Sequence, residues 1–218
     1  MRIILVVSAV LSLAPAVSAQ APSPVHELPF ASNDNTIELA IENDAPVAMG
    51  AINVAAEHLP GWLTFKSENL TLRGLAAGQK ETARFVFAVD KQAPVGEKQM
   101  IVLIVTGTGT GNRRWTREIT VTVAPPSGVD LFQNFPNPFN PVTHVGYVLR
   151  VNSHVRLSVY NLIGQEVAAL VEGEQEAGYH QATWNASSFS SGPYIARLVA
   201  RERGGKEVLM HRGMILMK

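Results

Sequence analysis

Apolar and polar residues alternate along most of this chain in short runs, with the two-residue period of β-strands. Thr82–Val89 is the clearest run, because every second residue in it is apolar. Thr36–Glu42 and His154–Tyr160 alternate in the same way. No segment shows a convincing 3.6-residue period of an amphipathic helix. The pattern therefore predicts an all-β protein.

Turn residues separate these runs at close spacing and divide them into two groups. Seven strands are predicted in the first group: Thr36–Glu42, Val47–Val54, Trp62–Phe65, Asn69–Leu72, Thr82–Val89, Gln99–Thr106 and Trp115–Val123. Six are predicted in the second: Thr143–Leu149, His154–Tyr160, Glu166–Val171, Tyr179–Trp184, Pro193–Ala200 and Glu207–Met217. Many short, one-sided strands favour two packed sheets, so each group predicts a β-sandwich.

A run of prolines, Ala124-Pro125-Pro126-Ser127-Gly128, separates the two groups. Proline lacks the N–H group that a sheet ladder needs, so this stretch predicts a domain boundary. The expected organisation is two Ig-like β-sandwich domains in tandem, 36–124 and 131–218, joined by a linker at 125–130. Residues 20–35 are rich in Pro, Ser, Asn and Asp and are expected to be a lead-in.

The first nineteen residues are expected to lie outside the fold. Met1-Arg2 carries one positive side chain, an uncharged aliphatic run follows, and small residues precede Ala19. This arrangement predicts a secretory signal peptide, cut after Ala19. The alternative is an uncleaved N-terminal anchor, although the apolar run is short for a membrane span. An exported protein is expected in either case.

Composition narrows the possible functions. The 218 residues include no cysteine and carry a formal net charge of zero. Disulfide staples, cysteine metal sites and thiol catalysis are therefore excluded. The neutral balance argues against a nucleic-acid partner or a polybasic membrane role.

One stretch, LFQNFPNPFNP at Leu131–Pro141, is too apolar for a plain linker and too rich in proline for a helix or a central strand. It is followed by four further motifs in order: VRLSVYNLIGQEV at 155–167, GYH at 178–180, WNAS at 184–187 and SGPY at 191–194. The chain closes on MILMK at 214–218. Together these motifs resemble the C-terminal sorting domain of the type IX secretion system, type A, over about 131–218. Pro193 and Ala196 depart from the usual pattern of the family, and these departures concern local packing.

The resemblance implies partners and a route. The partners are the type IX secretion machinery and a sortase-like peptidase, with attachment to surface lipopolysaccharide as a further step. The implied route runs through the periplasm to the cell surface or the medium, with a cut in or near Pro125–Asp130. The positions that carry the family motif here are Asn134, Pro136, Asn137, Pro138, Phe139, Asn140, Pro141, Gly164, Val167, Gly192, Tyr194 and Lys218.

Two weaker resemblances leave alternatives open. The flagellar hook-capping family implies a similar Ig-like sandwich for the second half. In the first half, LPGW at 59–62, the AGQ turn at 77–79 and APVG at 93–96 resemble Ig-like modules appended to secreted glycosidases. That second resemblance names an architecture and supplies no ligand. A carbohydrate-binding or adhesive module is the competing function.

No motif in the sequence marks an enzyme. G-x-S-x-G and H-E-x-x-H are absent, and no two of the six histidines stand at i, i+2 or i, i+4. The acidic stretch Glu172–Glu176 offers carboxylates to a hard cation, but a solvated turn is favoured. Trp62 and Trp115 suit sugar stacking only if they are exposed, and core positions are favoured. The expectation is a non-enzymatic protein without cofactor or metal.

Overall fold

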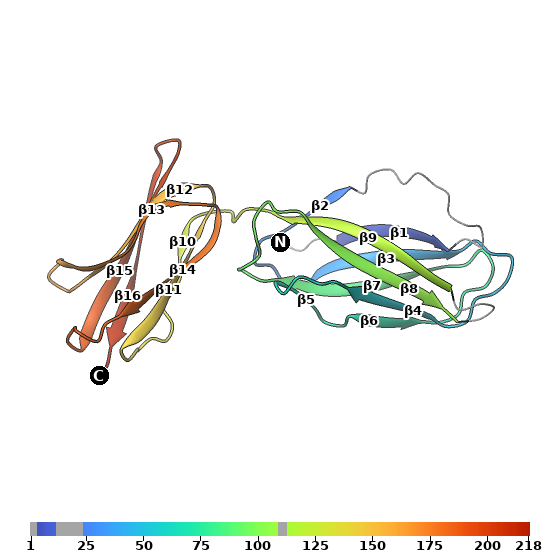
Figure 1. Cartoon of the computed structure of the whole chain (residues 1–218), viewed down its shortest axis with the longest axis horizontal. Coiled ribbons are helices and arrows are strands. Elements are labelled where there is room, and N and C mark those ends of the chain that lie inside the picture. Colours follow the sequence, from blue (N-terminus) through green and yellow to red (C-terminus); the bar gives the residue numbers. More distant parts are fainter. Residues whose placement is uncertain (1–3, 12–23, 109–112) are drawn as a thin grey trace. The chain divides into compact units, whose positions relative to one another are not determined.

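The computed structural model describes residues 4–11, 24–108 and 113–218. These ranges contain strands and no helix, so the predicted all-β class is confirmed (Figure 1). The chain forms two compact units, Met1–Ala124 and Pro125–Lys218. Each unit has its own hydrophobic core, built from the inward faces of its strands.

The first unit consists of two sheets. One sheet has the order β1-β3-β7-β5 and the other β2-β9-β8-β4-β6. Their strands are β1 (Ile4–Leu11), β2 (Val25–Leu28), β3 (Asn35–Asn43), β4 (Ile52–Glu57), β5 (Leu63–Phe65), β6 (Asn69–Leu72), β7 (Lys80–Val89), β8 (Gln99–Gly107) and β9 (Arg113–Val123). The alternating apolar residues of β3 and β7 face the core, where Ile37, Leu39, Phe85 and Phe87 are buried.

The second unit also consists of two sheets, with the orders β10-β11-β14 and β13-β12-β15-β16. Their strands are β10 (Asp130–Leu131), β11 (Val142–Leu149), β12 (Ser153–Tyr160), β13 (Glu166–Gln175), β14 (Gly178–Asn185), β15 (Gly192–Glu202) and β16 (Glu207–Leu216). Tyr147, Leu157, Trp184 and Leu198 are buried among the inward faces. Burial raises the pKa of Tyr147 to about 12.

The expectation that the first nineteen residues lie outside the fold differs from the structure. Ile4–Leu11 forms β1 and pairs in parallel with β3, from Ile4 opposite Thr36 to Leu11 opposite Asn43. The run is rich in β-branched residues, and β3 would otherwise end its sheet with unpaired backbone groups. The predicted cleavage position, Ala19, lies outside the described residues.

The lead-in predicted at 20–35 also contributes a strand. Val25–Leu28 forms β2, which pairs in parallel with β9, and Leu28 is completely buried. Four residues are too few to show a two-residue period. Because the surrounding stretch is rich in Pro, Ser, Asn and Asp, the sequence showed no sign of this strand.

The strand predicted at Val47–Val54 begins only at Ile52. The preceding residues form a loop because the buried Asn43 amide donates to the carbonyl oxygens of Val47 and Leu75, at 2.9 and 3.0 Å. The backbone N–H of Met49 also donates to Leu75 O, at 2.8 Å. These bonds take up backbone groups that a strand would use in its ladder.

The strand predicted at Glu166–Val171 is longer than expected. β13 continues to Gln175, so the acidic stretch lies partly on a strand and not in a turn. Two irregularities in the pairing with β12 lie between Leu157 and Ser158 and between Val159 and Tyr160. These bulges fall within the predicted part of the strand, at Leu170 and Val167. Beyond Val171 the strand reads Glu-Gly-Glu-Gln, which contains no apolar residue and therefore shows no alternation of apolar and polar positions.

Candidate functional site

The proline-rich segment, Leu131–Pro141, connects the two sheets of the second unit. At Phe135 it pairs with His144 of β11, through two backbone hydrogen bonds of 2.9 and 3.0 Å. At Phe139 it pairs with the end of β16, donating to Ile215 O and accepting from Met217 N, both at 2.9 Å. The prolines between these points cannot donate, so the segment makes two short bridges in place of a continuous ladder.

Side-chain amides add to these bridges. Asn134 is buried, and its amide donates to Pro136 O and to the Thr143 hydroxyl, both at 2.9 Å. The side-chain oxygen of Asn137 accepts from the backbone N–H of Ile215 at 2.9 Å. These asparagines therefore take the place of the backbone donors and acceptors that a proline-rich chain lacks.

An aromatic cluster lies beneath the segment. The Phe139 ring is 2% exposed and lies 5.3 Å from the Trp184 ring, measured between centroids. Trp184 makes an edge contact with Tyr194 at 5.0 Å and a tilted contact with Phe189 at 5.7 Å. The Tyr194 hydroxyl donates to Ser190 O at 2.7 Å. The WNAS and SGPY motifs thus pack against the proline-rich segment, although they are far from it in sequence.

The last residue is bound to the same region. The backbone N–H of Lys218 donates to the Ser191 hydroxyl at 3.0 Å. Its ammonium donates to Ser187 O at 2.6 Å and to Phe189 O. The closing MILMK motif therefore fixes the loop that carries the aromatic cluster.

The remaining motif positions have separate structural roles. Pro141 accepts a hydrogen bond from Ala186 N at 2.9 Å, and Asn140, Pro136 and Pro138 are exposed. The peptide bonds before Pro136 and Pro138 are cis. The structure brings five predicted positions into one assembly: Asn134, Asn137, Phe139, Tyr194 and Lys218.

Local structure accounts for the remaining three motif positions, Gly164, Val167 and Gly192. Gly164 has a φ of 78° in the turn between β12 and β13, a conformation that side chains disfavour. The Asn161 side chain closes that turn by accepting from Gln165 N at 3.0 Å. Val167 packs against the core, and Gly192, with a φ of 148°, begins β15. That the machinery reads any of these positions stays a prediction.

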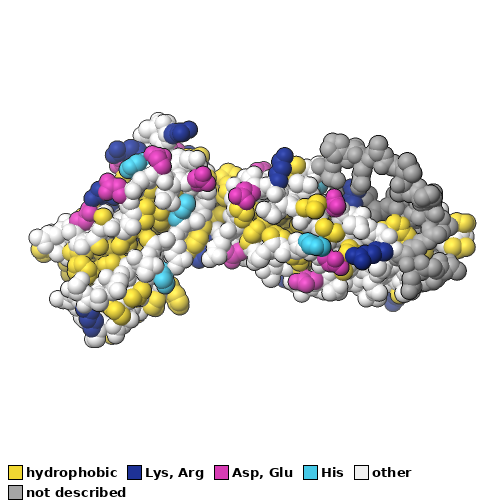
Figure 2. Space-filling view, viewed as in Figure 1, with side chains coloured by type: hydrophobic (Ala, Val, Ile, Leu, Met, Phe, Trp, Pro, Cys, Tyr) yellow, Lys and Arg dark blue, Asp and Glu magenta, His cyan; other side chains and the backbone are white. Residues whose placement is uncertain are grey.

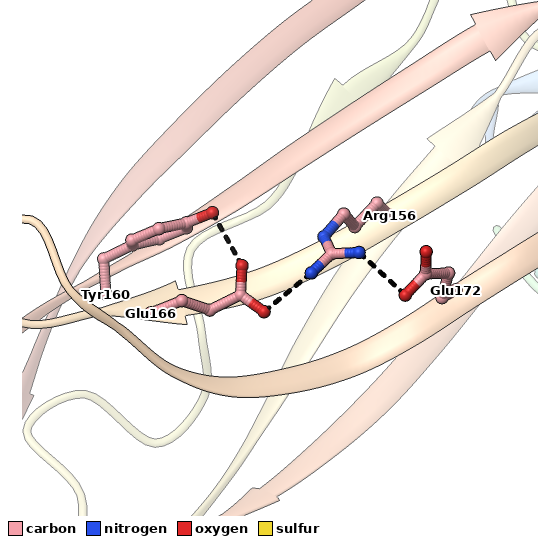
Figure 3. A network of polar contacts seen from close by, with 4 residues as sticks. All are labelled: Arg156, Tyr160, Glu166 and Glu172. Atoms are coloured by element: carbon pink, nitrogen blue, oxygen red, sulfur yellow. Dashed lines mark hydrogen bonds and ion pairs between the residues drawn. The ribbon is translucent and has the colours of Figure 1, made fainter.

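A polar network on β12 and β13 was not found from the sequence (Figure 3). Arg156 donates to Glu166 at 2.9 Å and to Glu172 at 2.8 Å, and the Tyr160 hydroxyl donates to Glu166 at 2.9 Å. The hydrogen bond from Tyr160, with those from Arg156, lowers the pKa of Glu166. Hydrogen bonding to Glu166 raises the pKa of Arg156. Only the cross-strand register brings these residues together, so spacing along the chain gave no signal.

Two possibilities from the sequence, a metal site and a sugar-binding face, can be compared with the geometry. Among the described residues, no group of three or more His, Asp or Glu side chains is placed to hold a metal ion. Phe65 is buried, while Trp62 and Trp115 are half-buried and pack against the core of the first unit. Phe65 therefore presents no ring to a ligand, and Trp62 and Trp115 each expose only part of their side chains.

No helix in the described ranges is long and apolar enough to cross a membrane. Arg114, beside Trp115, lies 3.7 Å from the Glu57 carboxylate.

Comparison with known proteins identifies the second unit. The family model of the secretion system C-terminal sorting domain matches residues 133–209. The sorting domain expected from the motifs is therefore confirmed, and the chain has the tail of a type IX secretion cargo. A search of the curated proteins found no match.

Several solved structures resemble the chain weakly. The CupB2 chaperone of Pseudomonas aeruginosa is 9% identical, with a TM-score of 0.25, over 88% of this chain and 98% of that one. Dimeric latent PorU of Porphyromonas gingivalis is 13% identical, with a TM-score of 0.36, over 92% of this chain and 19% of that one. The periplasmic chaperone SfaE is 10% identical, with a TM-score of 0.33, over 90% and 98%. These scores are too low to support a conclusion about function.

Proposed function

We propose that this protein is a non-enzymatic cargo of the type IX secretion system, and that its second unit directs it across the outer membrane. The observation that carries the proposal is the family match at 133–209. The bridges and aromatic cluster around the proline-rich segment support it, because they give the motif residues a common structural role. The second unit would act through its folded surface, with no chemistry of its own.

The first step of export is passage into the periplasm. We propose that Met1–Ala19 is a signal peptide and is cut after Ala19. The mature chain would then lack β1, and β3 would end its sheet. The charge and hydropathy pattern of the first nineteen residues supports this step.

The first unit would be the delivered part, as an Ig-like module. The packing of Trp62, Trp115 and Phe65 against its core gives no support to a carbohydrate-binding face. A carbohydrate-binding module therefore has less support than a plain structural or interaction domain.

The final steps would be removal of the second unit by a sortase-like peptidase and attachment of the product to surface lipopolysaccharide. The cut is expected in or near Pro125–Asp130. Support comes from the sequence, where a proline- and glycine-containing stretch precedes the first strand of the sorting domain. Mass spectrometry of the mature C-terminus would locate the cut, and an intact Lys218 on the surface form would rule it out.

Deletion of Leu131–Lys218 tests the proposal in a bacterium that has the type IX machinery. The full chain should become accessible to protease on intact cells, while the truncated chain should accumulate in the periplasm. Truncation after residue 130 removes all but the first six residues of the second unit and leaves the core of the first unit intact. Normal surface delivery of the truncated chain would refute the proposal.

A further inference from the structure

An open groove of about 380 Å³ lies on the outer face of the sheet β13-β12-β15-β16. We propose that it is the docking site for an extended segment of a partner in the export machinery, one that carries a bulky apolar side chain next to a carboxylate. This inference rests on the proposed function and names the surface through which the second unit would be recognised. The side chains that define the groove are Tyr160, Leu162, Ile195, Arg197, Leu209 and His211.

The groove is apolar where a partner would enter. Leu162 is 69% exposed and Leu209 is 54% exposed, and Ile163, next to the groove, is 78% exposed. Figure 2 shows hydrophobic side chains on the surface of the second unit. Clustered apolar side chains in water are a common mark of an interaction surface. Gly213 lies directly across from Ile195 and has no side chain to cover it.

One side of the groove carries the positive charge of Arg197 and, among the side chains described, contains no carboxylate to pair with it. Arg197 and His211 are cross-strand neighbours, and the Arg197 guanidinium lies 5.8 Å from the centre of the Tyr160 ring. None of the ion pairs between described residues involves Arg197, and none of the groove-lining side chains is a carboxylate. Glu166, which accepts from Tyr160, is already bonded to Arg156. A carboxylate on the partner would therefore complement Arg197.

The groove adjoins the edge strand of its sheet, which pairs with the proline-rich segment only near its end, and this favours an extended partner. β16 ends its sheet. The N–H and C=O of Ile215 point away from β15, because they bond to Asn137 and Phe139. Backbone direction alternates along a strand, so Leu209 and His211 also direct their N–H and C=O outward. No strand pairs with them there in the described ranges, although the His211 carbonyl accepts a hydrogen bond from the Arg212 guanidinium at 3.0 Å. An extended segment could add to this edge and place one side chain in the groove.

Gly213→Val in the full chain tests the groove. A Cβ built at Gly213 meets no atom within 4 Å, and the valine would stand beside Ile195 without disturbing the fold. Gly204→Val is the matched control, because a Cβ there also meets nothing and the residue lies in the turn after β15. We expect the Gly213 variant to lose surface delivery on the order of tenfold, the effect of about 1.4 kcal/mol of binding. The control should be delivered normally.

A charge series tests the carboxylate. Arg197→Glu should reduce delivery, and Arg197→Lys should retain most of it, because a positive charge remains. Equal delivery of Arg197→Glu and the unmodified chain would overturn the proposed partner chemistry. Circular dichroism and protease resistance of the purified variants show whether the fold is kept.

The outcomes separate this inference from the function on which it rests. If deletion of Leu131–Lys218 leaves delivery unchanged, the proposed function fails. If the deletion blocks delivery but Gly213→Val is delivered normally, only the groove is refuted. If sedimentation shows that the unmodified chain self-associates and Gly213→Val abolishes this while export is unchanged, the groove binds a second copy and the proposed occupant is wrong.

Discussion

Two phenylalanines of the proline-rich segment, Phe135 and Phe139, have opposite environments. The side chain of Phe135 is 78% exposed, whereas that of Phe139 is 2% exposed and contacts Trp184. Each stands next to a proline in the same apolar stretch, so the sequence does not distinguish them. Both backbones form a bridge to a strand, but the ring of Phe139 alone anchors the segment to the core of the second unit.

Phe139→Ala should therefore lower the free energy of unfolding of the second unit by about 3–5 kcal/mol, since it leaves a cavity beside Trp184. Phe135→Ala should change it by less than about 0.5 kcal/mol. Urea unfolding followed by tryptophan fluorescence reports this in the part of the signal that comes from Trp184, the only tryptophan of the second unit, while the part from Trp62 and Trp115 of the first unit should not shift. Similar losses for the two variants would contradict the assigned packing.

Asn134 and Asn140 form a second matched pair. Asn134→Ala leaves the buried Thr143 hydroxyl without its amide donor and should cost about 1–3 kcal/mol. Asn140 is exposed, so Asn140→Ala should be close to neutral. Denaturant midpoints of the two variants check the difference, and a neutral Asn134→Ala would show that its hydrogen bonds do not stabilise the fold.

At the scale of elements, the pairing of β12 with β13 carries the Arg156–Glu166–Glu172 network. The pKa of Glu166 is lowered in the folded state, chiefly by the hydrogen bond from Tyr160. Its contribution to stability is therefore present at neutral pH and is lost as the pH falls through that lowered pKa. The thermal midpoint of the unmodified chain should exceed that of Glu166→Gln at pH 7, and the two should converge in acid.

Glu176→Gln is the control for this titration, because Glu176 is exposed and lies beyond the end of β13. It should follow the unmodified chain across the pH range. A gap between Glu166→Gln and the unmodified chain that persists in acid would mean that the carboxylate is not the source of the difference.

Alternation was enough to predict most strands, because the long ones bury one face only. β3, β7 and β12 begin and end within two residues of their predicted limits. The predicted limits were wrong where the alternation did not report the pairing. Asn43 holds a loop where β4 was expected to begin, and the far half of β13, Glu172–Gln175, pairs with β12 although it has no apolar residue.

The motifs that make up the site could be predicted from the sequence, but the contacts between them could not. The sequence identified the proline-rich segment and the closing MILMK. It could not show that Asn137 and Phe139 bind β16, because that contact joins residues about 80 positions apart. The groove depends on cross-strand neighbours, Gly213 with Ile195 and Arg197 with His211, and register is not readable from one strand alone.

At the scale of the whole molecule, each unit has its own core, so loss of the first nineteen residues should leave both folded. A chain that begins at Gln20 should keep a cooperative unfolding transition, because β3 still pairs with β7 along its length. The β3 amides that face β1 should exchange with solvent faster than in the full chain. Hydrogen exchange measures this directly, and an unfolded first unit would show that β1 is required.

Sufficiency of the second unit tests the central claim most directly. Pro125–Lys218 would be fused to a periplasmic reporter that has its own signal peptide. Surface accessibility of the reporter would then be measured in cells with and without the type IX machinery. We predict that the reporter reaches the surface only when the machinery is present. A reporter that stays in the periplasm of cells with the machinery, although the fused unit is folded, would contradict the assignment of the second unit as a sorting domain.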